Sequence, residues 1–243
     1  MKALVNLLLL IAFISIYSCA PLYAPNAINV PLFSEKGEIQ ANISGGRNGY
    51  DLMTAYSITD HLAVMLNGQY QNRTRENVNV STKDYRQRTF GEAGFGYYMK
   101  LNEKTRFEAF GGGGLGNAAS YVENGLTDVR ANGEYSRFFI QPSIGKTSDI
   151  FDVAFSLRFG YVNLYNFNKE YQDLHFTPYT YLIEPMTTFR IGYKYVKFFI
   201  QVGASFHTEP HFYSSNIVPI VFNFGLNLNM GKYKKVEQPI NLP

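Results

Sequence analysis

From Gly37 onward, apolar and polar residues alternate with a period of two, and no segment keeps helical spacing for more than two turns. Such alternation predicts β-strands whose two faces meet different surroundings. In the clearest strand, one face carries Val153, Phe155, Leu157, Phe159 and Tyr161. The pattern predicts ten strands, at residues 37–45, 48–58, 61–72, 87–99, 104–116, 135–146, 152–165, 178–193, 196–207 and 216–230.

The connections between these strands alternate in length. Tight turns are expected at residues 59–60, 100–103, 147–151 and 194–195, and long polar loops at 73–86, 117–134, 166–177 and 208–215. Short turns at one end and long loops at the other are typical of outer-membrane barrels. The sequence therefore predicts an all-β fold, an antiparallel up-and-down transmembrane barrel of about ten strands over residues 37–231, with eight strands as the alternative count. An even count predicts that both termini lie at the short-turn, periplasmic side.

The residues on the other, polar face of the predicted strands indicate whether that face lines the interior of the barrel or its exterior. It is rich in amides, among them Gln40, Asn42, Asn67, Gln69, Gln141, Gln201, Asn223 and Asn227. The lysines after the leader lie outside the strand centres, whereas a water-facing exterior would be rich in lysine and glutamate. We therefore expect a polar lumen in which arginines pair with glutamates, namely Arg106, Arg158 and Arg190 with Glu92, Glu108 and Glu184. A soluble lipocalin-like, lipid-binding barrel with an apolar interior is the alternative.

Composition narrows the class of protein. Of the 243 residues, 46% are hydrophobic and 16% aromatic, which is too apolar for a disordered chain. The net charge is only +3 and the basic residues are scattered, so no nucleic-acid partner is expected. Nothing in the composition calls for a cofactor.

The first 18 residues read as an export signal, with Lys2 followed by an apolar run too short to span a membrane as a helix. Cys19 follows directly and is the only cysteine, so it cannot form an internal disulfide. The stretch resembles a bacterial lipoprotein signal, which implies that Cys19 is acylated, for example with palmitate, and becomes the new N-terminus. A small apolar residue within the signal is the simpler alternative. Residues 19–36 contain three prolines and predict an extended, lipidated tether, and residues 232–243 a polar tail.

Four short stretches resemble outer-membrane barrel lipoproteins of the Bacteroidota, a Gram-negative group. They are Tyr23-Ala24-Pro25-Asn26, residues 29–38, Gly49-Tyr50-Asp51-Leu52 and Thr59-Asp60-His61-Leu62. The resemblance implies a fold and a location in the outer membrane, with the bilayer as partner of the barrel exterior and of the acyl chains on Cys19. It implies no catalytic residue. Surface-exported members have acidic residues after the cysteine, and Ala20-Pro21-Leu22 has none, so the resemblance implies an anchor in the periplasmic leaflet.

Candidate chemistry is sparse. Gly111, Gly113 and Gly116 match GxGxxG, but no helical pattern follows, which favours a slim strand over a nucleotide loop. No metal site is expected at His207, Glu209 and His211, nor at Asp60-His61, which fits a tight turn. A rim-site enzyme, of the protease or lipid A deacylase type, would draw on Glu170, Asp173, His175, His207 and Glu209. We expect a structural or surface-interaction barrel without a catalytic site, and the rim-site enzyme is the alternative.

Overall fold

The computed structural model describes residues 22–77, 82–123, 128–169, 177–208 and 220–231. Their regular secondary structure consists of β-strands, in the order β1 (Ile39–Gly46), β2 (Gly49–Ser57), β3 (Leu62–Asn77), β4 (Thr82–Lys100), β5 (Thr105–Glu123), β6 (Asp128–Lys146), β7 (Phe151–Lys169), β8 (Tyr179–Tyr193), β9 (Val196–Ala204), β10 (Phe206–His207) and β11 (Ile220–Met230). Within these ranges, no helix is long and apolar enough to cross a membrane.

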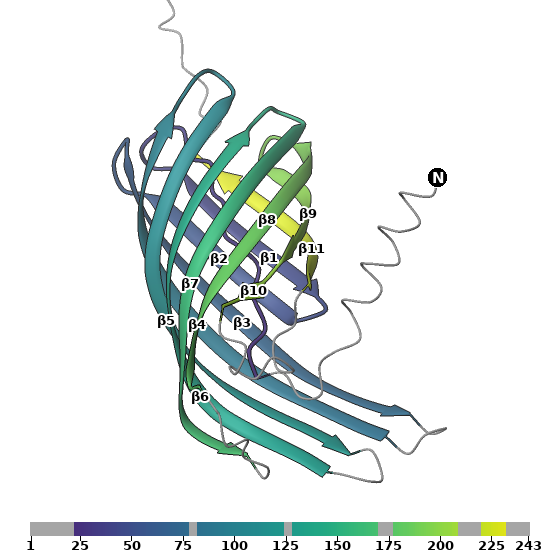
Figure 1. Cartoon of the computed structure of the whole chain (residues 1–243). Helices are drawn as coiled ribbons and strands as arrows, with labels where there is room; N and C mark the ends of the chain where they lie inside the picture. Colours follow the sequence, from purple (N-terminus) through teal and green to yellow (C-terminus); the bar gives the residue numbers. More distant parts are fainter. Residues whose placement is uncertain (1–21, 78–81, 124–127, 170–176, 209–219, 232–243) are drawn as a thin grey trace, which may run out of the picture.

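The strands form one closed antiparallel barrel with up-and-down order (Figure 1). From β1 to β9 each strand pairs with the next along the chain, β9 also pairs with β11, and the pairing of β11 with β1 completes the circle. β10 continues β9 beyond Ser205 and also pairs with β8, so the two pieces occupy one place in the wall. Ten strands therefore surround the lumen, and the predicted barrel fold is confirmed.

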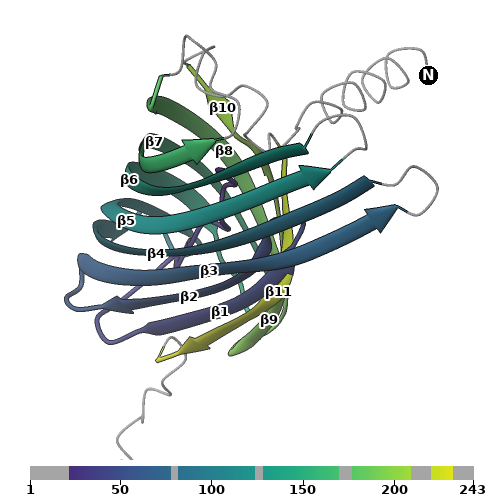
Figure 2. The same cartoon turned by 90° about the horizontal axis from the view of Figure 1, so that it is seen from below.

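The two ends of the barrel differ. At one end, here the short-turn end, β2 and β3, β4 and β5, β6 and β7, and β8 and β9 are joined by tight turns. At the other, the long-loop end, β3, β4, β5 and β6 extend past their neighbours as a curved sheet (Figures 1 and 2). Much of the predicted loops at residues 73–86 and 117–134 is therefore strand. Their outward faces are polar, so the sequence there lacks the apolar alternation that marks the wall.

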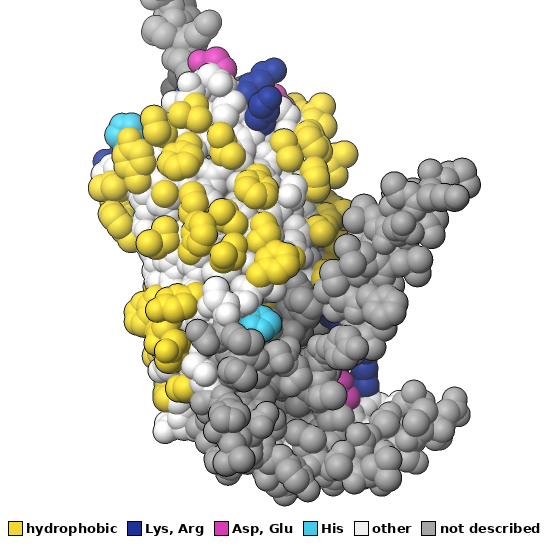
Figure 3. Space-filling view, viewed as in Figure 1, with side chains coloured by type: hydrophobic (Ala, Val, Ile, Leu, Met, Phe, Trp, Pro, Cys, Tyr) yellow, Lys and Arg dark blue, Asp and Glu magenta, His cyan; other side chains and the backbone are white. Residues whose placement is uncertain are grey.

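The wall separates an apolar exterior from a polar interior, as the alternation predicts. On β8, Tyr181, Ile183, Phe189 and Ile191 are exposed, whereas Thr180, Glu184, Thr188 and Arg190 are buried. The outward faces of β7, β8, β9 and β11 carry no charged residue among their described side chains. Figure 3 shows one side of this exterior, with hydrophobic side chains spread over the barrel and charged ones near its ends.

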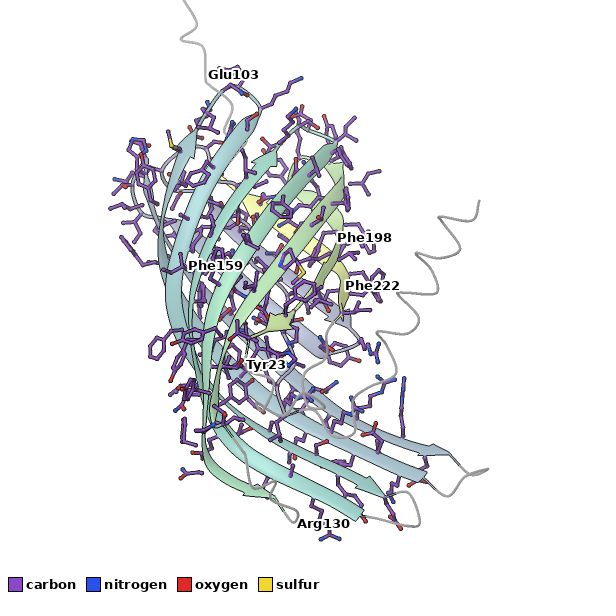
Figure 4. All side chains as sticks on the ribbon, in the orientation of Figure 1. Tyr23, Glu103, Arg130, Phe159, Phe198 and Phe222 are labelled. Carbon is purple, nitrogen blue, oxygen red and sulfur yellow. The ribbon has the colours of Figure 1, made fainter. Side chains whose placement is uncertain are left out.

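The segment that precedes β1 differs from its prediction as a tether. Residues 22–33 are extended, but they run through the barrel lumen, and every one of them is buried. We call residues 22–33 the luminal segment; Tyr23 marks its beginning in Figure 4. Its prolines lack an N–H and so disfavour regular strand pairing with the wall. Its backbone N–H and C=O groups instead need hydrogen-bond partners among the polar side chains that line the lumen.

A tight reversal joins the luminal segment to β1 at the short-turn end. The Glu38 carboxylate accepts hydrogen bonds from the backbone N–H groups of Ser34 and Glu35, both at 3.0 Å. Gly37 has a φ of 84°, in the left-handed region that favours glycine, and its N–H donates to the carbonyl of Ser57 at 2.9 Å. These contacts turn the chain from the lumen into the wall.

Candidate functional site

Hydrogen bonds fix the direction of the luminal segment. Near its start, the carbonyl of Pro25 accepts a hydrogen bond from the side chain of Asn48 at 3.0 Å, in the turn between β1 and β2 at the long-loop end. Just after its end, the hydroxyl of Ser34 accepts from Arg106 Nε at 2.8 Å, at the short-turn end. The chain thus crosses the whole lumen before β1 begins. The described chain starts at the long-loop end, whereas an even strand count alone predicts the opposite end.

Side-chain amides of the wall bind the backbone of the segment. Gln201 accepts from the N–H of Ile28 at 2.7 Å and donates to the carbonyl of the same residue at 2.9 Å, as a neighbouring strand would. Gln141 donates to the carbonyl of Asn29 at 2.8 Å. The side chain of Asn29 in turn donates to Asn67 at 2.9 Å. The amide-rich inward face predicted from sequence is therefore occupied by the chain's own backbone.

Two buried ion pairs lie beside Asn26, toward the long-loop end. Arg158 Nε donates to Glu184 Oε2 at 2.6 Å, and Arg137 pairs with Glu92. All four side chains are almost fully buried. Asn26 Oδ1 accepts from Arg137 at 2.9 Å and from Arg158 at 3.0 Å, while Asn26 Nδ2 donates to Glu92 at 3.1 Å. One amide of the luminal segment therefore bridges both pairs.

Tyr23 adds a second bridge between the same pairs. Its hydroxyl accepts from Arg137 Nη1 at 2.8 Å and donates to Glu184 Oε1 at 3.3 Å. Its ring meets Tyr135 edge-on, with ring centroids 5.8 Å apart, and Tyr135 stacks on Phe90 at 5.4 Å. Together with Leu22 these rings form an apolar cluster of buried residues across the lumen. The segment and this cluster fill the interior beside the ion pairs.

The structure places all six predicted lumen residues inside the barrel but brings only one predicted pair into direct contact. Arg158 and Glu184 pair, whereas Glu92 pairs with Arg137, a residue that was not among the predicted lumen charges. Arg137 has the same strand parity as Gln141 and Ser143, so the alternation contained the signal that could have found it.

The other predicted lumen charges bind mostly the chain that fills the lumen or the short-turn rim. Arg106 donates to Ser34 and to the carbonyl of Asn102, the latter at 2.7 Å. Arg190 donates to the carbonyl of Val30 and lies 4.0 Å from Asp152, and Glu108 accepts from the N–H of Leu32 at 2.8 Å. The alternation along each strand predicts that these residues face the lumen. It does not predict their partners in the luminal segment, because that segment has no periodicity.

The remaining candidates stay outside any assembled site. The glycines of GxGxxG lie within β5, which continues to Glu123, and a Cβ at Gly116 would come within 2.7 Å of the Tyr135 ring. Asp60 accepts from the N–H of Lys36 at 3.1 Å in a turn. His207 ends β10, and no metal-ligand cluster occurs among the described residues. The others lie outside those residues, as do Cys19, the signal and the tail: Glu170, Asp173, His175, Glu209 and His211.

Comparison of the chain with known protein families and with curated proteins finds no match. A function is therefore inferred from the structure of the barrel alone. A lumen occupied by the chain's own residues, with the carboxylates of both buried pairs bound to arginines, is suited to rigidity.

Proposed function

We propose that the protein is an outer-membrane β-barrel lipoprotein with a structural or surface-interaction role, whose lumen is closed by its own N-terminal segment. The observation that carries this proposal is the inversion of polarity across the wall: exposed Phe155 and Phe159 alternate with buried Ser156 and Arg158 along β7. A soluble lipocalin-like barrel keeps its apolar residues inside. Here the apolar face points outward, as a bilayer requires.

The extended sheet of β3 to β6 supports the orientation. Above the apolar belt its outward residues become polar, and they include an exposed ion pair, in which Lys83 lies 2.8 Å from Glu76. Long hairpins of outer-membrane barrels project to the cell exterior and short turns to the periplasm. This sheet is accordingly the surface-exposed part.

The path of the luminal segment bears on the lipid anchor. Leu22 lies at the long-loop end, where its carbonyl accepts from Arg88 at 3.1 Å. Cys19 precedes Leu22 by three residues, a span of at most about 10 Å. The mature N-terminus and its acyl chains on Cys19 therefore belong to the outer leaflet. This proposal replaces the periplasmic placement expected from strand count and from the absence of acidic residues after Cys19.

The closed lumen predicts how the purified protein behaves in a bilayer. The luminal segment occupies the interior from Leu22 to Phe33, so we expect no steady ionic conductance when the full chain is reconstituted in planar membranes. Single-channel recording at about 1 M salt measures this, with insertion verified by heat-modifiable migration on a gel. Stable conductance steps from folded, inserted protein would contradict the closed lumen.

The anchor is tested by where each terminus can be labelled on intact cells. An epitope inserted between Ala20 and Pro21 should bind antibody on whole cells, because the luminal segment delivers the N-terminus to the long-loop end. An epitope after Pro243 should require permeabilisation, because β11 ends at Met230, which pairs with Ile39 at the short-turn end.

The Cys19→Ser variant separates acylation of Cys19 from the passage of the luminal segment through the barrel. It should lose incorporation of radioactive palmitate yet keep the N-terminal epitope at the surface, because the contacts of residues 22–33 with the lumen do not depend on Cys19. Retained palmitate would refute acylation at Cys19. An N-terminal epitope reached only after permeabilisation would refute the threaded path or the proposed orientation.

A further inference from the structure

Five arginines gather at the long-loop end where the wall is lowest, beside the turn between β1 and β2. Arg47 comes from that turn, and Arg73, Arg75, Arg86 and Arg88 come from the inward faces of β3 and β4. We call these five residues the arginine cluster. With Asp84, Asn48 and Gln71 they line one small hollow of about 40 Å³. The cluster takes no part in the ion pairs that fill the lumen.

Most of this charge is not neutralised within the described part of the chain. Asp84 is the single acid lining the hollow, and both of its oxygens bind Arg86, at 2.9 and 2.7 Å. No described carboxylate lies within ion-pair distance of Arg47, Arg73 or Arg75. Within the described ranges, these three guanidinium groups therefore have no carboxylate partner.

The register of β3 and β4 brings like charges of the arginine cluster together, which destabilises this strand pair when no anion is bound. Arg73 lies directly opposite Arg86, and like charges at such positions destabilise a strand pair. Burial, and then the charges of Arg75 and Arg86, lower the pKa of Arg73. A multivalent anion would offset this repulsion and use the donors at once, because guanidinium groups bind phosphate oxygens in bidentate fashion.

A groove leads from the cluster over the rim to the apolar exterior. It has a volume of about 540 Å³, and its lining includes Arg47, Arg73 and Arg75 of the cluster together with Tyr50, Phe222 and Phe224. These three aromatic residues are exposed on the outward face of the wall. Gly45, Gly46 and Gly49 also line the groove, and a Cβ at Gly45 would come within 3.3 Å of the Tyr50 ring. The groove thus joins a cationic site to a surface suited to acyl chains.

We propose that the arginine cluster and this groove bind a phosphorylated lipid of the outer leaflet, with its phosphates on Arg73 and Arg75 and its acyl chains along Phe222 and Phe224. The lipid part rests on the proposed function, which puts this rim at the membrane surface. The phosphate part rests on the cluster alone.

The experiment measures lipid binding to the detergent-purified full chain by native mass spectrometry. The probes are bis-phosphorylated lipid A, the same lipid after enzymatic dephosphorylation, and inorganic pyrophosphate. The wild type should bind the phosphorylated lipid best, and binding should weaken as salt rises. The variant R73Q/R75Q should lose about tenfold or more in affinity, the scale of a lost charge-assisted contact.

A matched control removes two positive charges elsewhere. The variant K104Q/R130Q changes Lys104 in the turn between β4 and β5 and Arg130 on β6; both residues are exposed. It should bind within about twofold of the wild type, since long-range charge is screened at moderate salt. Equal losses in both variants would overturn the site.

The remaining outcomes separate this proposal from the proposed function. Equal binding of the dephosphorylated lipid would overturn the phosphate contacts, and equally tight binding of pyrophosphate would overturn the acyl groove. A chain that migrates as a folded, heat-modifiable barrel but binds none of the probes would overturn the whole inference. That result would leave the membrane barrel in place.

Discussion

Arg158→Leu should destabilise the barrel by about 3–5 kcal/mol, because it leaves the buried carboxylate of Glu184 without its cation. Glu184 is fully buried and, among the described residues, would keep the hydroxyls of Tyr23 and Ser205 as its hydrogen-bond donors. The double variant R158L/E184L should cost less than the single one, because no charge is then stranded. Urea unfolding in lipid vesicles, followed by heat-modifiable migration, measures the free energies of unfolding.

A partly exposed ion pair near the rim supplies the control for that experiment. Arg86 and Asp84 lie 2.7 Å apart with side chains 20% and 27% exposed, so Arg86→Gln should change the unfolding free energy by only about 0–1 kcal/mol. Comparable losses from Arg158→Leu and Arg86→Gln would mean that the lumen is wetter than its burial indicates. A double variant worse than Arg158→Leu alone would mean that Glu184 stabilises the fold by itself.

The wall of the barrel could be predicted from sequence because a period of two is imposed on every strand by its two surroundings. The residues of β7 and β8 alternate so regularly that the inward parity also placed Arg158 and Glu184 on one face. In the structure these two residues are register partners on adjacent strands. Because every strand has one face toward the lumen and one toward the exterior, the alternation along a strand shows which residues of different strands share a face.

The luminal segment could not be predicted in this way. Its residues have no period, because each faces a different part of the surrounding wall: Ala27 contacts Asp51, and Ile28 contacts Gln201, 173 residues away. An extended, proline-containing segment has the same sequence pattern whether it lies in solvent or inside a barrel. The hairpin extensions of β3 to β6 were missed for the converse reason: their outward residues are polar as well, so the sequence there lacks the apolar alternation of the wall.

Under the proposed function, Leu157→Arg should cost about 2–4 kcal/mol, because the outward side of β7 would then face lipid and the substitution puts a charge there at mid-strand. Leu157 lies opposite Pro185 of β8, and its outward neighbours Phe155 and Phe159 are exposed apolar residues of the belt. The cost arises from removing a guanidinium from water. Folding of the variant into lipid vesicles, compared with the parent by heat-modifiable migration, measures it.

The same substitution above the belt tests whether membrane depth sets the cost. Ala119 lies on the outward face of β5 in the extended sheet, where it is the register partner of Gln87 on β4 and Asn132 on β6. Ala119→Arg should therefore cost less than about 1 kcal/mol, since the side chain stays in water. If Leu157→Arg folded like the parent while Ser156→Leu failed, the chemistry of the two faces would be reversed. The outward aromatic belt would then serve a protein partner or a second copy of the chain rather than a bilayer.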